Sequence, residues 1–324
     1  MNVSNASTYA LTLSKIIGIV PLYINFITTI AGTIGGVCNL ITFTAPRLRT
    51  NSSVYYLSCA TVFEILSILF IVPTRIALDN FGNTLERQSM VFCKIRYYIS
   101  ITFPMLVTYY ILFAIVDRSL ATSRHVEIRA MSRLTFAHRI SWIIFLIGTT
   151  ASVHVFIFFN TINNNCQAPP GNVYTIVFAI YLIFIVSILP HSLMFIFALI
   201  TFRNFKRTRQ RAMPVLASAY NSRTKRSESQ LIMVIIAQIL ISSTLVLLRL
   251  GSYTYSTLTS GNQNKTVGQR AVEDFCIRLG FALYYFSFAT SFYLSTLPRK
   301  FFREIFFKRV RKLFYRFLRS FFVE

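Results

Sequence analysis

Acidic residues are scarce in this chain. Its 324 residues include only 10 aspartates and glutamates, and charged residues of both signs make up 13%. Soluble domains carry roughly 25% charged residues. Hydrophobic residues make up 54%, and the mean hydropathy is +0.57. This balance excludes a water-soluble domain and indicates an integral membrane protein.

Patterns that mark metal and catalytic sites are also missing. No two of the five cysteines show the Cys-x-x-Cys spacing of a metal site. His154 and His191 stand alone in apolar segments, and no cluster of His, Asp or Glu suits metal binding or general-base chemistry. We therefore expect no enzyme, metal site or cofactor. Met1–Ser14 is polar and uncharged, unlike a cleaved signal peptide.

Apolar segments long enough to cross a bilayer, which takes about 20 residues, recur along the chain. We predict an all-α fold: a seven-transmembrane helix bundle in residues 16–297, after an extracellular N-terminus (1–15) and before a cytoplasmic amphipathic helix and tail (298–324). The seven segments are about Ile16–Thr44, Val54–Leu78, Val91–Ser123, Ile140–Phe159, Val173–Phe202, Leu231–Tyr253 and Ala271–Leu297.

The basic residues predict the orientation of the bundle. The net charge of +23 does not form one patch for nucleic acid. Most lysines and arginines lie in alternate connecting segments and in the tail, which is the asymmetry of cytoplasmic loops. The N-terminus is then outside, where the sequons at Asn2, Asn5 and Asn264 can be glycosylated. In Arg299–Val323, phenylalanines recur every three or four residues among basic residues, which is typical of a helix on an anionic inner leaflet.

The third segment combines several polar residues with a long apolar run. Met105–Val116 carries no charge, and Asp117 and Arg118 follow it directly. Cys93 precedes Arg118 by about 37 Å of helix at roughly 1.5 Å per residue. The thiol and the guanidinium therefore belong to opposite membrane faces. Charges that snorkel to water at a helix end explain the Asp–Arg pair about as well as a functional site does.

Two polar side chains lie deep in the first two segments. Asn39 follows small residues (Gly-Gly-Val-Cys), and Glu64 is the single charge in the middle of the second segment. An unpaired carboxylate at mid-membrane costs about 2.5–3.5 kcal/mol, so Glu64 should face the bundle. We expect Asn39 and Glu64 to form an intramembrane polar network. Packing of close helices explains Asn39 and its small neighbours equally well.

Taken in order, these features resemble rhodopsin-like (class A) G-protein-coupled receptors. The shared features are the outer cysteine and inner Asp117–Arg118 of the third helix, Asn39 of the first, Glu64 of the second and Pro190 of the fifth. The chain looks most similar to invertebrate orphan neuropeptide (FMRFamide-like) receptors. It departs from the family in Ser119, where tyrosine is usual. It also lacks Cys-Trp-x-Pro near Ser242 and Asn-Pro-x-x-Tyr in the seventh segment, so the usual activation hinge is not expected.

The resemblance implies a site at each membrane face. A disulfide between Cys93 and Cys166 is expected outside, where both cysteines face an oxidising compartment. Arg118 would couple to a heterotrimeric G protein inside, with Asp117 holding it in the resting state. A pocket favouring an anionic or peptide ligand could involve Arg96, Tyr97, Ser100, Arg249 and Tyr285. Anchoring at the membrane interface explains Arg96, Tyr97, Arg249 and Tyr285 at least as well. Serine at position 100, where amine receptors have aspartate, argues against a biogenic amine.

The implied function is that of a plasma-membrane receptor. It would bind an extracellular ligand, a peptide being one candidate, and activate a G protein by rearranging its helices. The alternative is a seven-helix transporter or channel, a class that tends to show internal repeats or several intramembrane charges along a path. Neither is seen in the sequence, and Glu64 is the one mid-membrane acid.

Overall fold

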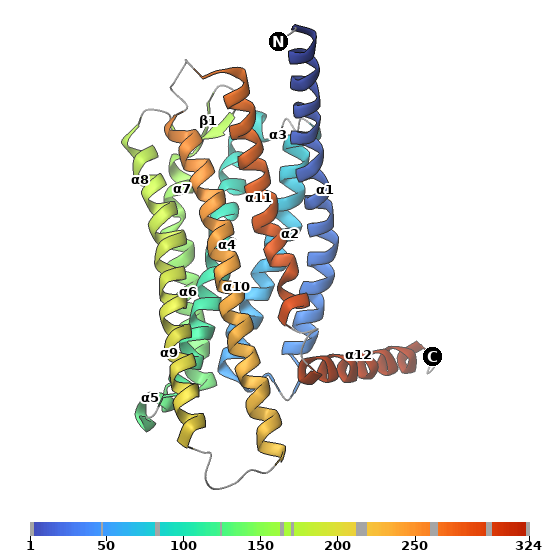
Figure 1. The fold of residues 1–324 in the computed structure, drawn as a ribbon, viewed down its shortest axis with the longest axis vertical. Helices are drawn as coiled ribbons and strands as arrows, with labels where there is room; N and C mark the ends of the chain where they lie inside the picture. The colour runs from blue at the N-terminus through green and yellow to red at the C-terminus, as the bar shows by residue number, and fades with distance from the viewer. Residues whose placement is uncertain are drawn as a thin grey trace.

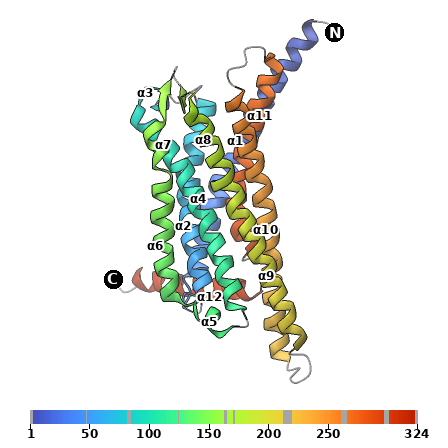
Figure 2. The same ribbon diagram turned by 90° about the vertical axis from the view of Figure 1, so that its left-hand side faces the viewer.

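The protein is described here by a computed structural model. It describes residues 3–46, 48–81, 85–123, 125–162, 165–169, 172–211, 219–259, 265–295 and 300–321. Long helices run side by side along one axis in both views (Figure 1 and Figure 2). The N-terminus lies at one end of this bundle, and α12 (Lys300–Phe321) lies across the opposite end.

Six helices or helical stretches are long and apolar enough to cross a membrane, within the residues that were described. They confirm a multi-pass helical membrane protein. They are Gly18–Phe43 of α1 (Val3–Phe43), α2 (Ser52–Phe81), α4 (Met90–Ala121), Leu134–Phe158 across α6 (Leu134–Ala151) and α7 (Val153–Phe158), Val173–Asn204 from α8 to α9, and Gly268–Leu294 of α11 (Val267–Ser295).

The predicted sixth segment, Leu231–Tyr253, lies within the long helix α10 (Ala219–Leu258). The side chains of residues 231–237 are outside the described part of the chain. The helix itself runs the length of the bundle between α9 and α11 (Figure 1). The count of seven spans stays a prediction. Two short helices, α3 (Leu85–Gln88) and α5 (Val126–Ala130), lie in the connections beside α4.

The fifth predicted segment is an interrupted helix. It begins as α8 (Val173–Tyr181), widens into a π-helical stretch at Leu182–Ile188 and continues as α9 (Leu189–Arg211). Pro190 follows this stretch and has no N–H to donate to the preceding turn. The local widening re-pairs the backbone here, since the Leu189 N–H donates to the carbonyl of Phe184, five residues back.

Side chains are distributed as expected for helices surrounded by lipid. Many small and polar side chains are buried between helices, and many large apolar ones point outward. Trp142, for example, is 66% exposed. Close contact of α1 and α2 depends on Gly36, because a Cβ added there would collide with the side chain of Ile65. The small residues before Asn39 thus allow the close packing expected of them.

A short β-hairpin departs from the predicted all-α fold. Strands β1 (Asn160–Ile162) and β2 (Asn165–Gln167) pair antiparallel, with Thr161 opposite Cys166. The hairpin lies in the polar connection after α7, at the end of the bundle away from α12 (Figure 1). Polar residues without an alternating apolar pattern gave no strand signal in this stretch.

Helix α12 is fixed to the bundle by its first turn. Phe302 is buried against Phe43, Leu48 and Val54, where α1 ends and α2 begins. Farther along, α12 points away from the bundle (Figure 1), and Phe307 is 59% exposed. The helix predicted in the tail is therefore present, and its contact with a membrane surface stays a prediction.

Candidate functional site

A disulfide joins Cys93 and Cys166, as expected. It connects the first turn of α4 to β2, across a sequence separation of 73 residues, and both residues are buried. Phe159 is fully buried before β1, and its ring centroid lies 4.7 Å from that of Tyr97 on α4. The covalent bond and this packing hold the hairpin against the end of the bundle.

Asp117 lies at the opposite end of α4 and is 6% exposed. Its Oδ2 accepts hydrogen bonds from Ser52 Oγ, at 2.8 Å, and from Ser53 Oγ. Its Oδ1 accepts a hydrogen bond from Ser132 Oγ at 2.9 Å. Ser52 and Ser53 begin α2, and Ser132 lies between α5 and α6. The carboxylate therefore ties three separate segments together at this end of the bundle.

These partners of Asp117 differ from the expected one. All the hydrogen bonds that the structure gives to its carboxylate come from serine hydroxyls rather than from Arg118. Hydroxyl donors to an ionised acceptor make strong, short hydrogen bonds. We call Asp117, Ser52, Ser53 and Ser132 the serine clamp.

Arg118 instead lines a large cavity between the helices. The centres of water molecules can occupy a volume of about 120 Å³ inside this cavity. This is room for several waters. It extends from Arg118 and Phe302 near the α12 end toward Tyr284 in the middle of the bundle. Its walls come from α2, α4, α9, α10 and α11, with Phe43 of α1 and Phe302 of α12 at its edges.

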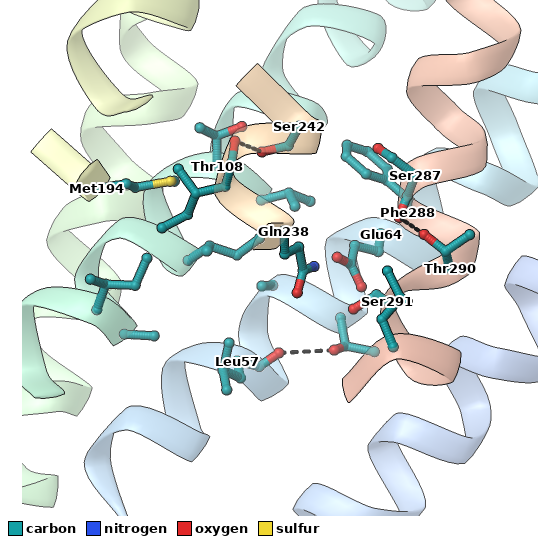
Figure 3. A pocket seen from close by; sticks show the side chains of 18 of the residues that line it. Leu57, Glu64, Thr108, Met194, Gln238, Ser242, Ser287, Phe288, Thr290 and Ser291 are labelled. Carbon is teal, nitrogen blue, oxygen red and sulfur yellow. Dashed lines mark hydrogen bonds between the residues drawn. The ribbon is translucent and has the colours of Figure 1, made fainter. Parts of the chain in front are cut away.

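Several polar side chains line this cavity. Glu64, Gln238, Ser287 and Ser291 face it from α2, α10 and α11 (Figure 3). Glu64 is 4% exposed, and no hydrogen bond or ion pair joins it to another residue in the part of the chain that the structure describes. A carboxyl group in this position can bind a proton, a cation or water inside the bundle.

Asn39 is buried on α1, as expected for a residue between helices. It has an interaction of its own, but no hydrogen bond to Glu64 is found among the described residues. Small residues and close packing of α1 on α2 account for its surroundings. A polar network linking Asn39 directly to Glu64 stays a prediction.

A group of arginines and aromatic rings lies nearer the disulfide end. The Arg249 guanidinium carbon lies 4.7 Å from the ring centroid of Tyr284, 5.3 Å from that of Tyr285 and 5.5 Å from that of Phe281. Cations are attracted to the faces of such rings. Within the described residues, no carboxylate pairs with Arg249. The structure thus brings together two of the predicted pocket residues, Arg249 and Tyr285.

The other predicted pocket residues lie on α4. Arg96 is buried, and its guanidinium carbon is 5.5 Å from the Tyr97 ring centroid. Ser100 is half-buried one turn farther along. The role of these residues in ligand binding stays a prediction.

An ion-pair network beside this group was not predicted. Arg75 pairs with Asp79 at 2.7 Å, and Arg278 pairs with Asp274 at 2.8 Å. Arg278 also donates a hydrogen bond to the Asp79 carbonyl at 3.3 Å, which connects α11 to α2. The i,i+4 spacing within each pair could have predicted these two ion pairs from the sequence. The sequence gives no such signal for the contact between Arg278 and Asp79, which are 199 residues apart.

The structure does not test the predicted glycosylation sites. Asn2 and Asn264 lie outside the described residues, and Asn5 lies on α1 with its side chain outside them. In the described part of the chain, no three His, Cys, Asp or Glu side chains form a group that could hold a metal ion. Cys38, Cys59 and Cys276 are free.

Comparisons with known proteins leave function to be argued from this geometry. No model of a known protein family matches the chain, and no curated protein matches it either.

Proposed function

We propose that this chain is a rhodopsin-like G-protein-coupled receptor, which binds an extracellular ligand and activates a heterotrimeric G protein. The observation that carries the proposal is the arrangement of α4. One end of this helix is joined by a disulfide to the β-hairpin, and Arg118 at the other end lines an internal cavity. Six candidate spans, with α10 as the seventh, support the same proposal.

The proposed mechanism is a shift between two arrangements of the bundle. A ligand that binds one arrangement more tightly than the other changes their populations. The inner ends of α9 and α10 would move, and the cavity beside Arg118 would admit a segment of the G protein. The serine clamp would hold α2, α4 and the 131–133 segment together while α9 and α10 move.

The ligand that we propose carries an anionic group, as a free acid or a peptide carboxylate does. Arg249 supports this choice, because its charge faces three aromatic rings and no carboxylate in the described residues. Arg75 and Arg278 already have carboxylate partners. A planar guanidinium can bind a carboxylate or phosphate with two hydrogen bonds.

The test is G-protein activation by Arg118→Ala, normalised to receptor at the cell surface. We expect signalling to be abolished and surface expression retained. Arg139→Ala removes an exposed arginine at the same end of the bundle and serves as the matched control. Unaltered coupling in Arg118→Ala would refute the role of this residue. A library of acidic small molecules and peptides, applied to the wild-type chain, would identify the ligand.

Glu64 favours one competing function, a transporter or channel for protons or cations. Its buried carboxyl group faces an internal cavity and has no partner among the described residues. Glu64→Gln would abolish transport into liposomes if this were the function, and no variant would then activate a G protein. Under the receptor proposal, purified wild-type protein carries no ion flux.

The proposed location is the plasma membrane, with the N-terminus outside and α12 on an anionic inner leaflet. An N-terminal epitope should be reachable by antibody on intact cells, whereas a C-terminal epitope should require permeabilisation. The reverse staining would refute this orientation.

A further inference from the structure

Ser132 is the one member of the serine clamp on a non-helical segment. It lies between α5, which ends at Ala130, and α6, which begins at Leu134, and it is partly exposed. Its Oγ donates to Asp117 and lies 3.2 Å from Ser52 Oγ. This single hydroxyl therefore connects the segment to α4 and α2.

Arginines flank Ser132 in the pattern Arg129-Ala-Met-Ser132-Arg133. Both arginines are exposed, and Arg133 has an extended backbone, with φ −118° and ψ 148°. Serine kinases with an acidic substrate groove select arginine three residues before the acceptor serine, because charge patterns determine kinase–substrate pairing. Ser123, in the same connection, has Leu120 at that position instead.

We propose that Ser132 is a phosphorylation site whose modification opens the serine clamp. A kinase would transfer the γ-phosphoryl group of ATP to Ser132 Oγ. The new Oγ–P bond replaces the bond between the γ-phosphorus and the bridging oxygen of ADP, and the hydroxyl proton passes to the kinase. The inference rests on the proposed function only in assigning this end of the bundle to the ATP-containing cytoplasm.

A phosphate cannot occupy the position of the Ser132 hydroxyl. At neutral pH the phosphate is mostly a dianion and then has no proton to donate. Its charge of about −1.5 to −2 would also repel the Asp117 carboxylate. Asp117 would lose its hydrogen bond from Ser132 and keep the hydrogen bonds from Ser52 and Ser53.

The start of α6 offers the phosphate a better position. Arg133 is the N-cap residue of this helix, and no side chain caps its first turn. The first backbone N–H groups of a helix have no partner within it and attract anions. Arg129 and Arg133 add positive charge nearby. The phosphate would therefore move from Asp117 toward the N-terminus of α6.

Within the serine clamp, Ser52 is the competing acceptor, because Arg49 precedes it by three residues. Ser52 is 5% exposed and begins α2. A kinase needs its substrate extended, and extending this segment would require unwinding of the first turn of a packed helix. The geometry therefore favours Ser132 over Ser52.

The experiment uses the full chain, purified in lipid nanodiscs that leave both faces accessible. It is incubated with ATP and the catalytic subunit of the cyclic-AMP-dependent protein kinase, and phosphate is located by mass spectrometry. A peptide covering residues 127–135 reports whether the kinase accepts the sequence. We expect phosphate on Ser132 in both peptide and protein, little on Ser123, and loss of the Ser132 signal in Arg129→Ala.

Hydrogen exchange then tests the consequence. Backbone exchange in residues 125–133 should rise about tenfold on phosphorylation, as for loss of one charge-assisted hydrogen bond. Ser132→Ala, which cannot be phosphorylated, should show the faster exchange with or without kinase. An unmodified peptide, phosphate on Ser52 instead of Ser132, or phosphorylation without faster exchange would each overturn the proposal. None of these readouts uses a G protein or a ligand, so failure of the receptor proposal would be seen separately.

Discussion

The two ends of α4 are held by different kinds of bond. At one end, Cys93 is joined covalently to the hairpin through Cys166. At the other, Asp117 is held by hydrogen bonds from three serine hydroxyls. A disulfide opens only by reduction, whereas hydrogen bonds can exchange with water or with other partners. The comparison indicates which end of the bundle can rearrange, and it is the end where the cavity reaches Arg118.

The same difference is seen in how charge is balanced. Near the disulfide, Arg75 and Arg278 share the carboxylates of Asp79 and Asp274, and Arg249 faces aromatic rings. At the other end, one carboxylate is surrounded by neutral hydroxyls. An added charge would therefore act differently at the two ends: an anion is attracted near Arg249 and repelled near Asp117.

Breaking the covalent end should have the largest effect. Cys93→Ser opens a loop that spans 73 residues in sequence, and the chain-entropy estimate for such a loop is about 4 kcal/mol. We expect only a small amount of this variant at the cell surface, because most of it should be retained inside the cell. Cys276→Ser, which removes a free cysteine, should be expressed like the wild type. Equal surface levels of the two variants would contradict a structural role for the disulfide.

Breaking the hydrogen-bonded end should have a smaller effect. Asp117→Ala removes the shared acceptor of three hydroxyls and should lower the free energy of unfolding by about 2–3 kcal/mol. The apparent melting temperature of the purified protein would measure the loss. The cost is limited because Ser52 and Ser132, 3.2 Å apart, can still bond to each other.

The matched variants for this prediction are Asp117→Asn and Asp274→Ala. Asp117→Asn keeps one carbonyl acceptor and should lose about half as much stability. The Asp274 side chain is 47% exposed, and an exposed ion pair contributes only about 0–1 kcal/mol. If Asp274→Ala were as destabilising as Asp117→Ala, the serine clamp would not be what holds this end.

The two ends also differ in how far the sequence predicted them. The disulfide followed from a family resemblance that agrees with the predicted sidedness, which places Cys93 and the loop holding Cys166 at the same membrane face. The partners of Asp117 did not follow, since Ser52 and Ser53 are 65 and 64 residues away and serines near helix starts are common. Apolar length predicted the spans because lipid requires it. It could not predict which polar side chains would meet between them.

The interruptions of the helices illustrate the same limit. A proline such as Pro190 disfavours a regular helix in the fifth segment, but the π-helical stretch precedes the proline at Leu182–Ile188. The direction and extent of such a change depend on packing of neighbouring helices, which a single segment does not contain. The hairpin similarly owes its strands to the disulfide and to burial of Phe159 more than to strand-forming residues.

The smallest expected effect comes from the arginines near the disulfide, and it distinguishes binding residues from structural ones. A partly buried charge without a counter-ion costs free energy, and its replacement by an apolar side chain of similar size is often neutral or stabilising. Arg249→Met should therefore leave the free energy of unfolding of the ligand-free protein unchanged or raise it by about 1 kcal/mol at most, after loss of the contacts with the rings.

Arg278→Met provides the contrast. It removes the partner of Asp274 and the bond from α11 to the Asp79 carbonyl, so it should lower stability by about 1 kcal/mol. Thermal unfolding of both variants without ligand measures the difference, and G-protein activation by an acidic ligand, once found, should be lost in Arg249→Met. A stability loss in Arg249→Met as large as that in Arg278→Met would mean that Arg249 supports the fold. The proposed anion site would then have to be sought elsewhere.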